Sequence, residues 1–450
     1  MNTENSKKAF LSTQGYRGTR DFYPEDQRLR AYIYHKIHTV MKSFGYEEYD
    51  GPFVELLELY AAKSSEEIVR DQLYSFLDKG ERHLAIRPEM TPTLARMVAA
   101  KQQQLQRPIR WYSIPTCMRF ERPQRGRLRE FDQLNVDIFG GNSLDEDIEV
   151  LLTIVEILKS LGASNQDFII KLNNRALVNS YVQHVLHINS EKVTPLFRLL
   201  DKRDKLTAEV FYEECQKLNF NPTQIDSLEK FLHADLDEII SLFDSTESEG
   251  GLVAKQMKLR VDAVNQITNS KCVVFAPDIM RGFDYYTGMI FEVFDTHPEN
   301  RRALCGGGRY DNLVSAFGGA ELSGIGYGMG DVALQNFMEV HNLTPKLQKE
   351  THVSVIRFGE SDRLHTLKLS AALRKLGLNV ECCVTLNKFG KQIQSAEKLG
   401  VKVVVFCGET EMQNQAFAVK WLQTGQQEVF SFDEPGLNSF YKKFLLGNPA

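Results

Sequence analysis

The sequence predicts an α/β protein of several domains, in which strand-rich segments flank a helical insertion and a small α/β domain ends the chain. Its 450 residues are enough for two to four domains with large cores. Strand and helix patterns alternate up to residue 172 and return at residue 271, whereas residues 173–270 are rich in helix formers and charge and lack strong strand patterns. From residue 351, strand and helix patterns follow in the order βαβαβ, which is typical of a small α/β domain.

The composition is ordinary for a soluble globular protein, with 42% hydrophobic and 25% charged residues. The net charge of −5 gives no global basic field, so a nucleic-acid partner would have to meet local patches. The polar N-terminus and the absence of a run of eighteen apolar residues predict neither a secretory signal nor a membrane span. The seven cysteines have no CxxC or cysteine–histidine spacing, which predicts reduced thiols in a cytosolic compartment and no zinc site.

Local sequence patterns predict the following segments in the first part of the chain. They are a disordered segment over residues 1–14, a helix over 25–44, a strand over 46–55, a hairpin of strands 73–77 and 84–86, a helix from Thr91, strands over 109–114 and 131–139, a helix over 144–161, and a strand over 168–172. Gly45 ends the first helix, and Pro92 occupies the tolerated first position of the helix that follows Glu89. Glu89 therefore lies at a strand-to-helix turn, where it could either point into a pocket or cap the helix.

Arginine is concentrated between Arg107 and Arg129, where seven arginines accompany one acidic residue, Glu121. Such a run is usually a solvated loop. Here strand patterns frame it, and residues 123–126 (PQRG) have turn chemistry. Period-two alternation in the exit strand puts the side chains of Phe131, Gln133, Asn135 and Asp137 on one face. A hairpin with guanidinium groups, an aromatic ring and a carboxylate predicts a site for an anionic ligand that also has a flat part and a cationic part.

Glycine dominates the strand patterns that follow the insertion. Strands are expected over residues 272–276 and 289–294, followed by a glycine cluster over 305–311 and a strand over 324–330 (GIGYGMG). The alternating glycines of the last strand lie on one face, which lets either a ligand or another backbone approach closely. Asp331 is expected to cap the next helix.

The C-terminal domain is expected to contain strands, helices and a final hairpin. The strands cover residues 352–357, 380–384 and 401–406, the helices 361–376 and 390–399, and the hairpin 416–422 and 428–432. Between residues 351 and 450, twelve Lys and Arg oppose nine Asp and Glu, and this balance of +3 is consistent with a module that faces nucleic acid.

Five segments together resemble the histidyl-tRNA synthetases, a family of class II aminoacyl-tRNA synthetases, over nearly the whole chain. They are Arg87–Thr91 (RPEMT), Arg119–Arg127 with Phe131 and Gln133 (motif 2), Arg281–Gly288 (RGFDYYTG, the histidine-specific loop), Gly307–Asp311 (GGRYD), and the C-terminal domain with Lys388–Gln392 (KFGKQ). The resemblance implies an antiparallel catalytic sheet with flanking helices. The catalytic domain would cover residues 15–172 and 271–340, and an anticodon-binding domain residues 351–450.

The resemblance also implies roles for individual residues. Arg119 and Arg281 would be catalytic and would hold the α-phosphate of ATP. Histidine would be bound by Glu89, Met90, Thr91, Arg119, Gln133, Asp137, Arg281, Tyr285 and Tyr286, and ATP by Arg119, Glu121, Arg127, Phe131, Arg281 and Gly328. The implied partners are ATP with Mg²⁺, L-histidine, tRNA(His) contacted by Arg122, Arg125 and Arg127, and a second copy of the chain in a cytoplasmic homodimer, with no protein metal ligand.

The chain departs from the class II pattern in motif 3, which usually ends with an arginine that clamps ATP. Alignment of residues 324–334 places Ala333 there, and no arginine lies between Arg309 and Arg357. The resemblance therefore implies an active histidine–tRNA ligase as the first hypothesis. The alternatives are a catalytically silent paralogue that regulates ATP phosphoribosyltransferase and a tRNA-binding sensor without ligase activity.

Overall fold

The computed structural model describes residues 11–61, 68–141, 143–200, 202–203, 206–243, 248–279, 286–300, 302–382 and 388–447. The chain divides into two compact units, Met1–Pro345 and Lys346–Ala450. Residues 1–10 of the segment that was expected to be disordered lie outside the described residues, as do Arg281 and Tyr285.

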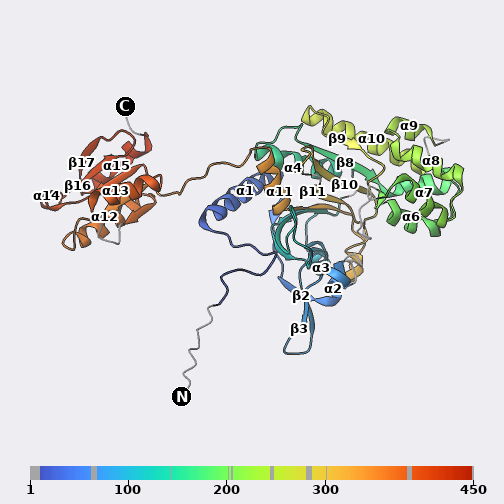
Figure 1. Cartoon of the computed structure of the whole chain (residues 1–450), viewed down its shortest axis with the longest axis horizontal. Helices are drawn as coiled ribbons and strands as arrows, with labels where there is room; N and C mark the ends of the chain where they lie inside the picture. Colours follow the sequence, from blue (N-terminus) through green and yellow to red (C-terminus); the bar gives the residue numbers. More distant parts are fainter. Residues whose placement is uncertain are drawn as a thin grey trace, which may run out of the picture. The chain divides into compact units, whose positions relative to one another are not determined.

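A nine-stranded sheet forms the centre of the N-terminal unit, with the order β1-β5-β7-β12-β11-β10-β8-β9 and with β6 paired to β7 (Figure 1). Its strands are β1 (Glu47–Glu48), β5 (Ile109–Ser113), β6 (Thr116–Met118), β7 (Glu130–Phe139), β8 (Phe168–Asn174), β9 (Val273–Phe275), β10 (Met289–Asp295), β11 (Ala303–Arg309) and β12 (Gly324–Gly330). The β1–β5 and β8–β9 pairs are parallel and the other pairs are antiparallel, which confirms the predicted fold class. Most of the glycine cluster of residues 305–311 belongs to β11, so the turn that the resemblance implied for Gly307–Asp311 begins only after Arg309.

Helices cover both faces of this sheet. On one face lie α1 (Pro24–Ser43), α4 (Leu144–Ser160) and α11 (Asp331–Val340), whose apolar residues share a core with those of β7 and β12. The first of them begins with Pro24 and an acidic turn, and it buries Ile33, Ile37, Val40 and Met41 at the spacing that predicted it. On the other face, α3 (Thr91–Lys101) packs with Ile109 and Phe139 in a second core.

The segment 46–55 does not form the single strand that its alternation predicted. Its first half is β1 in the large sheet, and its second half begins β2 (Val54–Leu56) in a three-stranded sheet with β3 (Ser75–Leu77) and β4 (His83–Ile86). Pro52 lies between the two strands and lacks the N–H that a continuous ladder requires. The predicted β3–β4 hairpin is confirmed, and the short helix α2 (Leu57–Ala61) and a helical turn at Ile68–Gln72 connect β2 to it.

Residues that follow β8 form a group of helices at one side of the unit (Figure 1). They are α5 (Arg175–Ser180), short turns at Tyr181–Val185 and Ser190–Lys192, α6 (Val193–Leu200), α7 (Ala208–Lys217), α8 (Pro222–His233), α9 (Leu236–Ser241) and α10 (Glu249–Thr268). Side chains of Thr207, Asn221, Asp235 and Ser248 cap four of these helices. The last helix contributes Met257 and Val264 to the core of the large sheet, so it joins the helical group to that core.

The C-terminal unit contains a five-stranded sheet in the order β14-β13-β15-β16-β17. Its strands are β13 (Val353–Ile356), β14 (Val380–Cys382), β15 (Val403–Phe406), β16 (Ala416–Trp421) and β17 (Gln427–Ser431), and its helices are α12 (Arg363–Lys375), α13 (Phe389–Lys398), α14 (Glu409–Gln413) and α15 (Glu434–Leu445). The first three strands pair in parallel and the hairpin adds two antiparallel pairs, so the predicted βαβαβ order and final hairpin are confirmed. In neither unit is any described helix both long and apolar enough to span a bilayer.

Candidate active site

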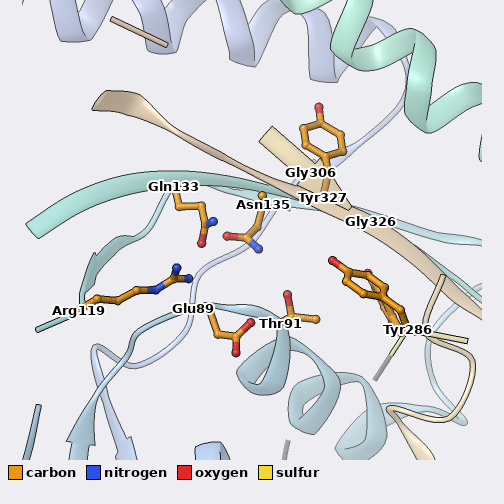
Figure 2. Close-up of a pocket in the computed structure, with 11 residues that line it drawn as sticks. Glu89, Thr91, Arg119, Gln133, Asn135, Tyr286, Gly306, Gly326 and Tyr327 are labelled. Carbon is orange, nitrogen blue, oxygen red and sulfur yellow. The ribbon is translucent and has the colours of Figure 1, made fainter. Parts of the chain in front are cut away.

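A polar cavity lies beside the large sheet of the N-terminal unit, next to the start of α3 (Figure 2). It contains about 460 Å³ of space that atoms do not fill, part of it open to solvent. Its lining residues are Glu89, Thr91, Arg119, Gln133, Asn135, Tyr286, Gly306, Tyr310, Gly326, Tyr327 and Gly328. The cavity therefore brings together segments that lie more than 200 residues apart in the sequence.

The glycines of β12 leave room for this cavity. Ile325, Tyr327 and Met329 pack into the core on the opposite face, as the alternation predicted. Tyr327 points away from the cavity in Figure 2, and its hydroxyl lies 3.1 Å from Thr153 Oγ1. A Cβ atom at Gly326 or Gly328 would overlap side-chain atoms of β7. The glycine face of β12 therefore allows the side chains of β7 to pack closely against it and also forms part of the cavity wall.

Strand β7 supplies a row of acceptor groups, because Gln133, Asn135 and Asp137 share one face. Asp137 is buried, and the hydroxyl of Tyr310 donates to its Oδ1. Among the described residues, Asp137 Oδ2, Asn135 Oδ1 and Gln133 Oε1 have no hydrogen-bond donor. Burial raises the pKa of Asp137 to about 7, although the Tyr310 hydroxyl acts in the opposite direction. Buried acceptors without donors suit a ligand that carries N–H groups.

Arg119 and Phe131 form a second part of the site. Arg119 Nε donates to the carbonyl oxygen of Pro88 at 2.8 Å, and its guanidinium lies over the Phe131 ring, 5.3 Å from the centroid. In Figure 2 the guanidinium of Arg119 points toward Gln133. A fixed guanidinium beside an aromatic ring fits a ligand that joins a phosphate to a flat base.

Glu89 and Thr91 enter from the turn between β4 and α3. Glu89 is 3% exposed and lines the cavity, whereas Met90 is the N-cap residue of α3 and makes no side-chain cap bond. Glu89 therefore lies in the cavity wall, one residue before the N-cap of α3. The side chain of Met90 is fully buried, and its Sδ lies 3.9 Å from Arg87 Nη1, so its predicted contact with histidine stays a prediction.

Other predicted site residues lie around this cavity. Glu121 forms an ion pair with Arg127, with Oε2 and Nη1 2.8 Å apart. Tyr286 and Gly328 belong to the lining. The sequence places Asn135 on the site face of β7 without a role, and it gives no sign of Tyr310. Only the fold brings Tyr310 to Asp137.

Asp331 does not cap α11, which corrects the expectation from the sequence. The N-cap residue is Gly330, and Asp331 occupies the first turn. Its carboxylate binds Arg20 Nη2 at 2.6 Å and accepts the backbone N–H of Asp132 at 3.0 Å. Tertiary partners with full positive charge or a fixed N–H compete successfully for this buried carboxylate.

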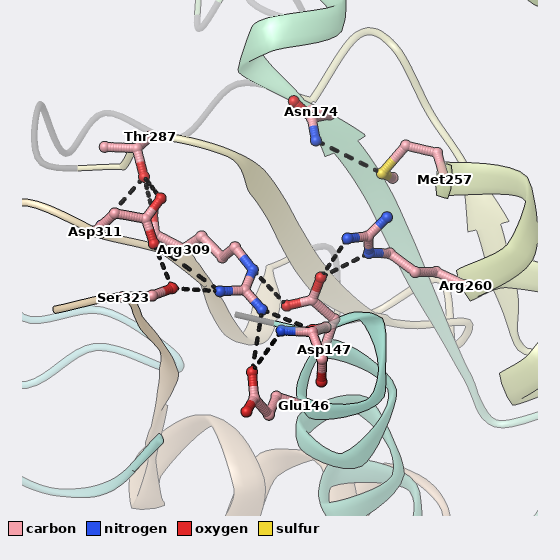
Figure 3. A network of polar contacts seen from close by, with 10 residues as sticks. Glu146, Asp147, Asn174, Met257, Arg260, Thr287, Arg309, Asp311 and Ser323 are labelled. Carbon is pink, nitrogen blue, oxygen red and sulfur yellow. Dashed lines mark hydrogen bonds and ion pairs between the residues drawn. The ribbon is translucent and has the colours of Figure 1, made fainter. Parts of the chain in front are cut away.

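A network of charged groups surrounds Arg309 at the end of β11 (Figure 3). Asp147 on α4 lies between two cations, with Oδ1 2.8 Å from Arg309 Nε and Oδ2 2.6 Å from Arg260 Nε. Burial raises the pKa of Asp147, and the two arginines oppose this effect. The backbone N–H of Thr287 donates to the Arg309 carbonyl at 2.8 Å, and the Thr287 hydroxyl donates to Asp311 at 2.7 Å. The network thereby anchors the segment that carries Tyr286 to β11.

Comparison with known protein families decides the assignment. A family model described as histidyl-tRNA synthetase matches residues 18–332, and one described as an anticodon binding domain matches residues 352–435. The chain belongs to the histidyl-tRNA synthetase family. A histidine–tRNA ligase from Leptospira biflexa serovar Patoc is 42% identical over 429 residues, which cover 95% of this chain and 97% of that relative. One from Haloarcula marismortui is 35% identical over 412 residues, which cover 91% and 94%.

Solved structures of the family have the same fold. The crystal structure of histidyl-tRNA synthetase from Nostoc sp. PCC 7120 matches with a TM-score of 0.78 and 26% identity, and the match covers 96% of this chain and all of that one. An ATP phosphoribosyltransferase regulatory subunit/histidyl-tRNA synthetase from Bacillus halodurans C matches with a TM-score of 0.73 and 23% identity over 89% of this chain and 99% of that one, which shows shared fold alone.

Proposed function

We propose that the chain is a histidine–tRNA ligase, which activates histidine with ATP and transfers it to tRNA(His). One observation carries the proposal: the polar cavity on β7 adjoins the pair formed by Arg119 and Phe131. An amino acid and a nucleotide bound in these two places would meet at Arg119. Family membership and the anticodon-binding domain agree with this function.

The nucleotide would lie with adenine on Phe131 and its α-phosphate on Arg119. One oxygen of the histidine carboxylate attacks the α-phosphorus, the bond to the pyrophosphate group breaks, and histidyl-adenylate forms. Charge accumulates on the phosphate oxygens during this step, and the fixed guanidinium of Arg119, with Arg281 as a second proposed ligand, would stabilise it. A terminal hydroxyl of the tRNA then attacks the carbonyl carbon, and AMP leaves.

The histidine side chain would occupy the end of the cavity at Asp137. The carboxylate of Asp137 would accept one imidazole N–H, and a tyrosine hydroxyl, from Tyr286 or Tyr285, would pair with the other nitrogen. Glu89, Thr91 and Gln133 would receive the α-amino group. Analogues without both ring nitrogens would leave these buried groups unpaired, which gives strong discrimination.

Mg²⁺ would accompany ATP. Among the described residues, no group of three or more His, Cys, Asp or Glu side chains is arranged to hold a metal ion. Mg²⁺ usually keeps several waters and binds through substrate phosphates with one or two protein carboxylates. Glu121 is a carboxylate beside the proposed phosphate position. The ion would neutralise phosphate charge.

Further parts of the proposal concern the whole molecule. The catalytic domain would cover residues 15–172 and 271–340, the insertion 173–270, and the anticodon-binding domain 351–450. Arg122, Arg125 and Arg127 would contact the acceptor end of the tRNA. The active form would be a cytoplasmic homodimer, which light scattering of the purified chain would test.

Histidine-dependent exchange between ATP and pyrophosphate tests the proposed activity, because it requires only the first step. Purified chain should exchange label when histidine is present and should aminoacylate tRNA(His). Exchange at background level would refute the ligase assignment. Ala333 favours one second candidate, the silent regulatory paralogue, which predicts no exchange and co-purification with a phosphoribosyltransferase.

A further inference from the structure

Arg302 precedes β11 at a position that faces the start of α11. Strand β11 begins at Ala303, directly after Arg302, and α11 packs against this strand. Ala333, in the first turn of α11, occupies the motif 3 position at which class II synthetases have an arginine. Arg302 therefore approaches from the adjacent strand the region where that guanidinium is missing.

The tip of the motif 2 hairpin touches the same region. A Cβ atom at Gly126 would lie 3.7 Å from Arg302 Cδ and 3.5 Å from Asn336 Nδ2, so these two atoms lie within about 7 Å of each other. Asn336 is on α11, one turn after Ala333 and hence on the same side of the helix. Its Nδ2 has no hydrogen-bond acceptor among the described residues.

Positive charge exceeds negative charge around the tip of the motif 2 hairpin. Arg127 Nη1 pairs with Glu121 Oε2 at 2.8 Å, and Arg125 Nη1 lies 3.5 Å from Glu299 Oε2. No ion pair formed within the described part of the chain includes Arg302, which is exposed. Partial burial and the nearby positive charge of Arg127 lower the pKa of Arg302, and Glu121 opposes them. Two guanidinium groups thus share one carboxylate, and an anion between them would relieve the imbalance.

The guanidinium groups of Arg127 and Arg302 and the proposed α-phosphate ligand Arg119 all lie at the motif 2 hairpin. The backbone N–H of Glu121 donates to the carbonyl oxygen of Arg119 at 2.8 Å, and the Glu121 side chain reaches Arg127, whose charge acts on Arg302. A ligand with its first phosphate on Arg119 and further phosphates beyond it would therefore extend toward Arg127 and Arg302. Such a ligand is a nucleoside triphosphate, whereas a monophosphate would end at Arg119.

We propose that Arg302, together with Arg127, binds the β- and γ-phosphates of ATP and so replaces the arginine that Ala333 lacks. The inference rests on the proposed ligase function, because it takes the nucleotide position from it. It assigns to Arg302 a substrate-binding role that motif comparison cannot reveal, since the guanidinium comes from a different strand.

The test compares full-length wild-type protein with Arg302→Gln, Arg302→Lys and the double variant Arg302→Gln/Ala333→Arg. Arg82→Gln is the matched control, because Arg82 is an exposed arginine on the β3–β4 hairpin that pairs with Asp78. The measurements are the KM values for ATP and histidine in pyrophosphate exchange, and the calorimetric Kd values for ATP and AMP. AMP separates the roles, since it lacks the phosphates that Arg302 would bind.

Arg302→Gln should raise the KM and Kd for ATP about tenfold or more, the usual effect of losing a charge-assisted hydrogen bond. Its KM for histidine and its Kd for AMP should stay within about twofold of wild type. The lysine variant should be intermediate, the double variant should regain most ATP affinity, and Arg82→Gln should match wild type.

Unchanged ATP affinity in Arg302→Gln, or equal weakening of ATP and AMP, would overturn the inference. ATP affinity that stays at the Arg302→Gln level in the double variant would overturn the claim that positions 302 and 333 serve the same phosphates. If the wild-type protein shows no exchange, the ligase proposal fails. The calorimetric comparison of ATP with AMP still decides the role of Arg302 in that case, so the two failures are distinguishable.

Discussion

Replacement of Asp137 by asparagine should stabilise the unliganded protein at high pH while it weakens histidine activation. The side chain is buried, and its pKa is raised to about 7 from an ordinary value of 3.8. Asparagine has nearly the same size, and its Oδ1 can still accept the hydroxyl hydrogen of Tyr310. The substitution therefore removes the ionisation and preserves the principal contact.

The expected magnitude follows from this pKa difference. In the unfolded chain the carboxyl loses its proton near pH 3.8, but in the folded chain it keeps the proton until about pH 7. Wild-type stability should thus decrease as pH rises between these values, and each pKa unit corresponds to about 1.36 kcal/mol. The penalty for ionising Asp137 should be about 2 kcal/mol at pH 5.5 and about 4 kcal/mol at pH 8. The advantage of Asp137→Asn should grow by about 2 kcal/mol over this interval.

Tryptophan fluorescence can follow unfolding in urea at the site itself. The chain has two tryptophans, and Trp111 on β5 is the cross-strand partner of Asp137. In a Trp421→Phe background, the remaining tryptophan reports only on the N-terminal unit. Asp145→Asn, which changes an exposed carboxylate in the first turn of α4, controls for the loss of a carboxylate. Pyrophosphate exchange should fall in Asp137→Asn because the imidazole loses an anionic acceptor.

Two results would refute this reasoning. If Asp137→Asn changes the free energy of unfolding by the same amount at pH 5.5 and pH 8, the carboxyl does not carry a raised pKa in the folded protein. If the variant exchanges pyrophosphate with wild-type kcat/KM for histidine, Asp137 does not contact the substrate.

Three further substitutions probe other parts of the site. Gly326→Ala would place a methyl group against Asp137 and the Tyr310 hydroxyl, so histidine-dependent exchange should fall about 100-fold. The control Gly330→Ala adds a methyl group that meets no atom within 4 Å and should remain active. Equal activities of the two variants would contradict the role of the glycine face of β12. Arg309→Met leaves buried Asp147 with Arg260 as its remaining close arginine, and it should lower the free energy of unfolding in urea by about 3 kcal/mol. The exposed control Arg82→Gln should lower it by less than about 0.5 kcal/mol. A loss as small as that of the control would show that the network is not needed for stability. Arg119→Lys loses the two-pronged donor and should lower kcat/KM for ATP about 100-fold with unchanged circular dichroism, and near-normal exchange would exclude Arg119 from the chemistry.

Most helices and strands could be predicted because their patterns are local. The apolar spacing of α1, the stop at Gly45 and the alternation of β12 each depend on neighbours within a few residues. The division of residues 46–55 between two sheets could not be predicted in this way. Alternation indicates an extended chain, but only tertiary pairing decides which sheet each half joins.

The sequence could predict those site residues whose positions depend on a single strand or a single turn. Gln133 and Asp137 were placed on one face by period two, and Glu89 by its turn. Asp331 was misassigned because the sequence contains no sign of its pairing with Arg20, which lies 311 residues away. Tyr310 was missed for the same reason, since its contact with Asp137 spans 173 residues.

Strand β12 lies between the other two strands at the cavity, β7 and β11, and this position explains why it carries the glycines. Strand β7 supplies acceptors and β11 leads to Tyr310, and β12 pairs with both of them. The Tyr310 hydroxyl can reach Asp137 only across β12, so a side chain at Gly326 would separate donor from acceptor. The ion pair between Arg309 and Asp147 fixes the end of β11 directly before Tyr310. The position of Tyr310 therefore depends both on the missing side chain at Gly326 and on a buried charge network. The geometry of the histidine end therefore depends on residues that would never touch histidine.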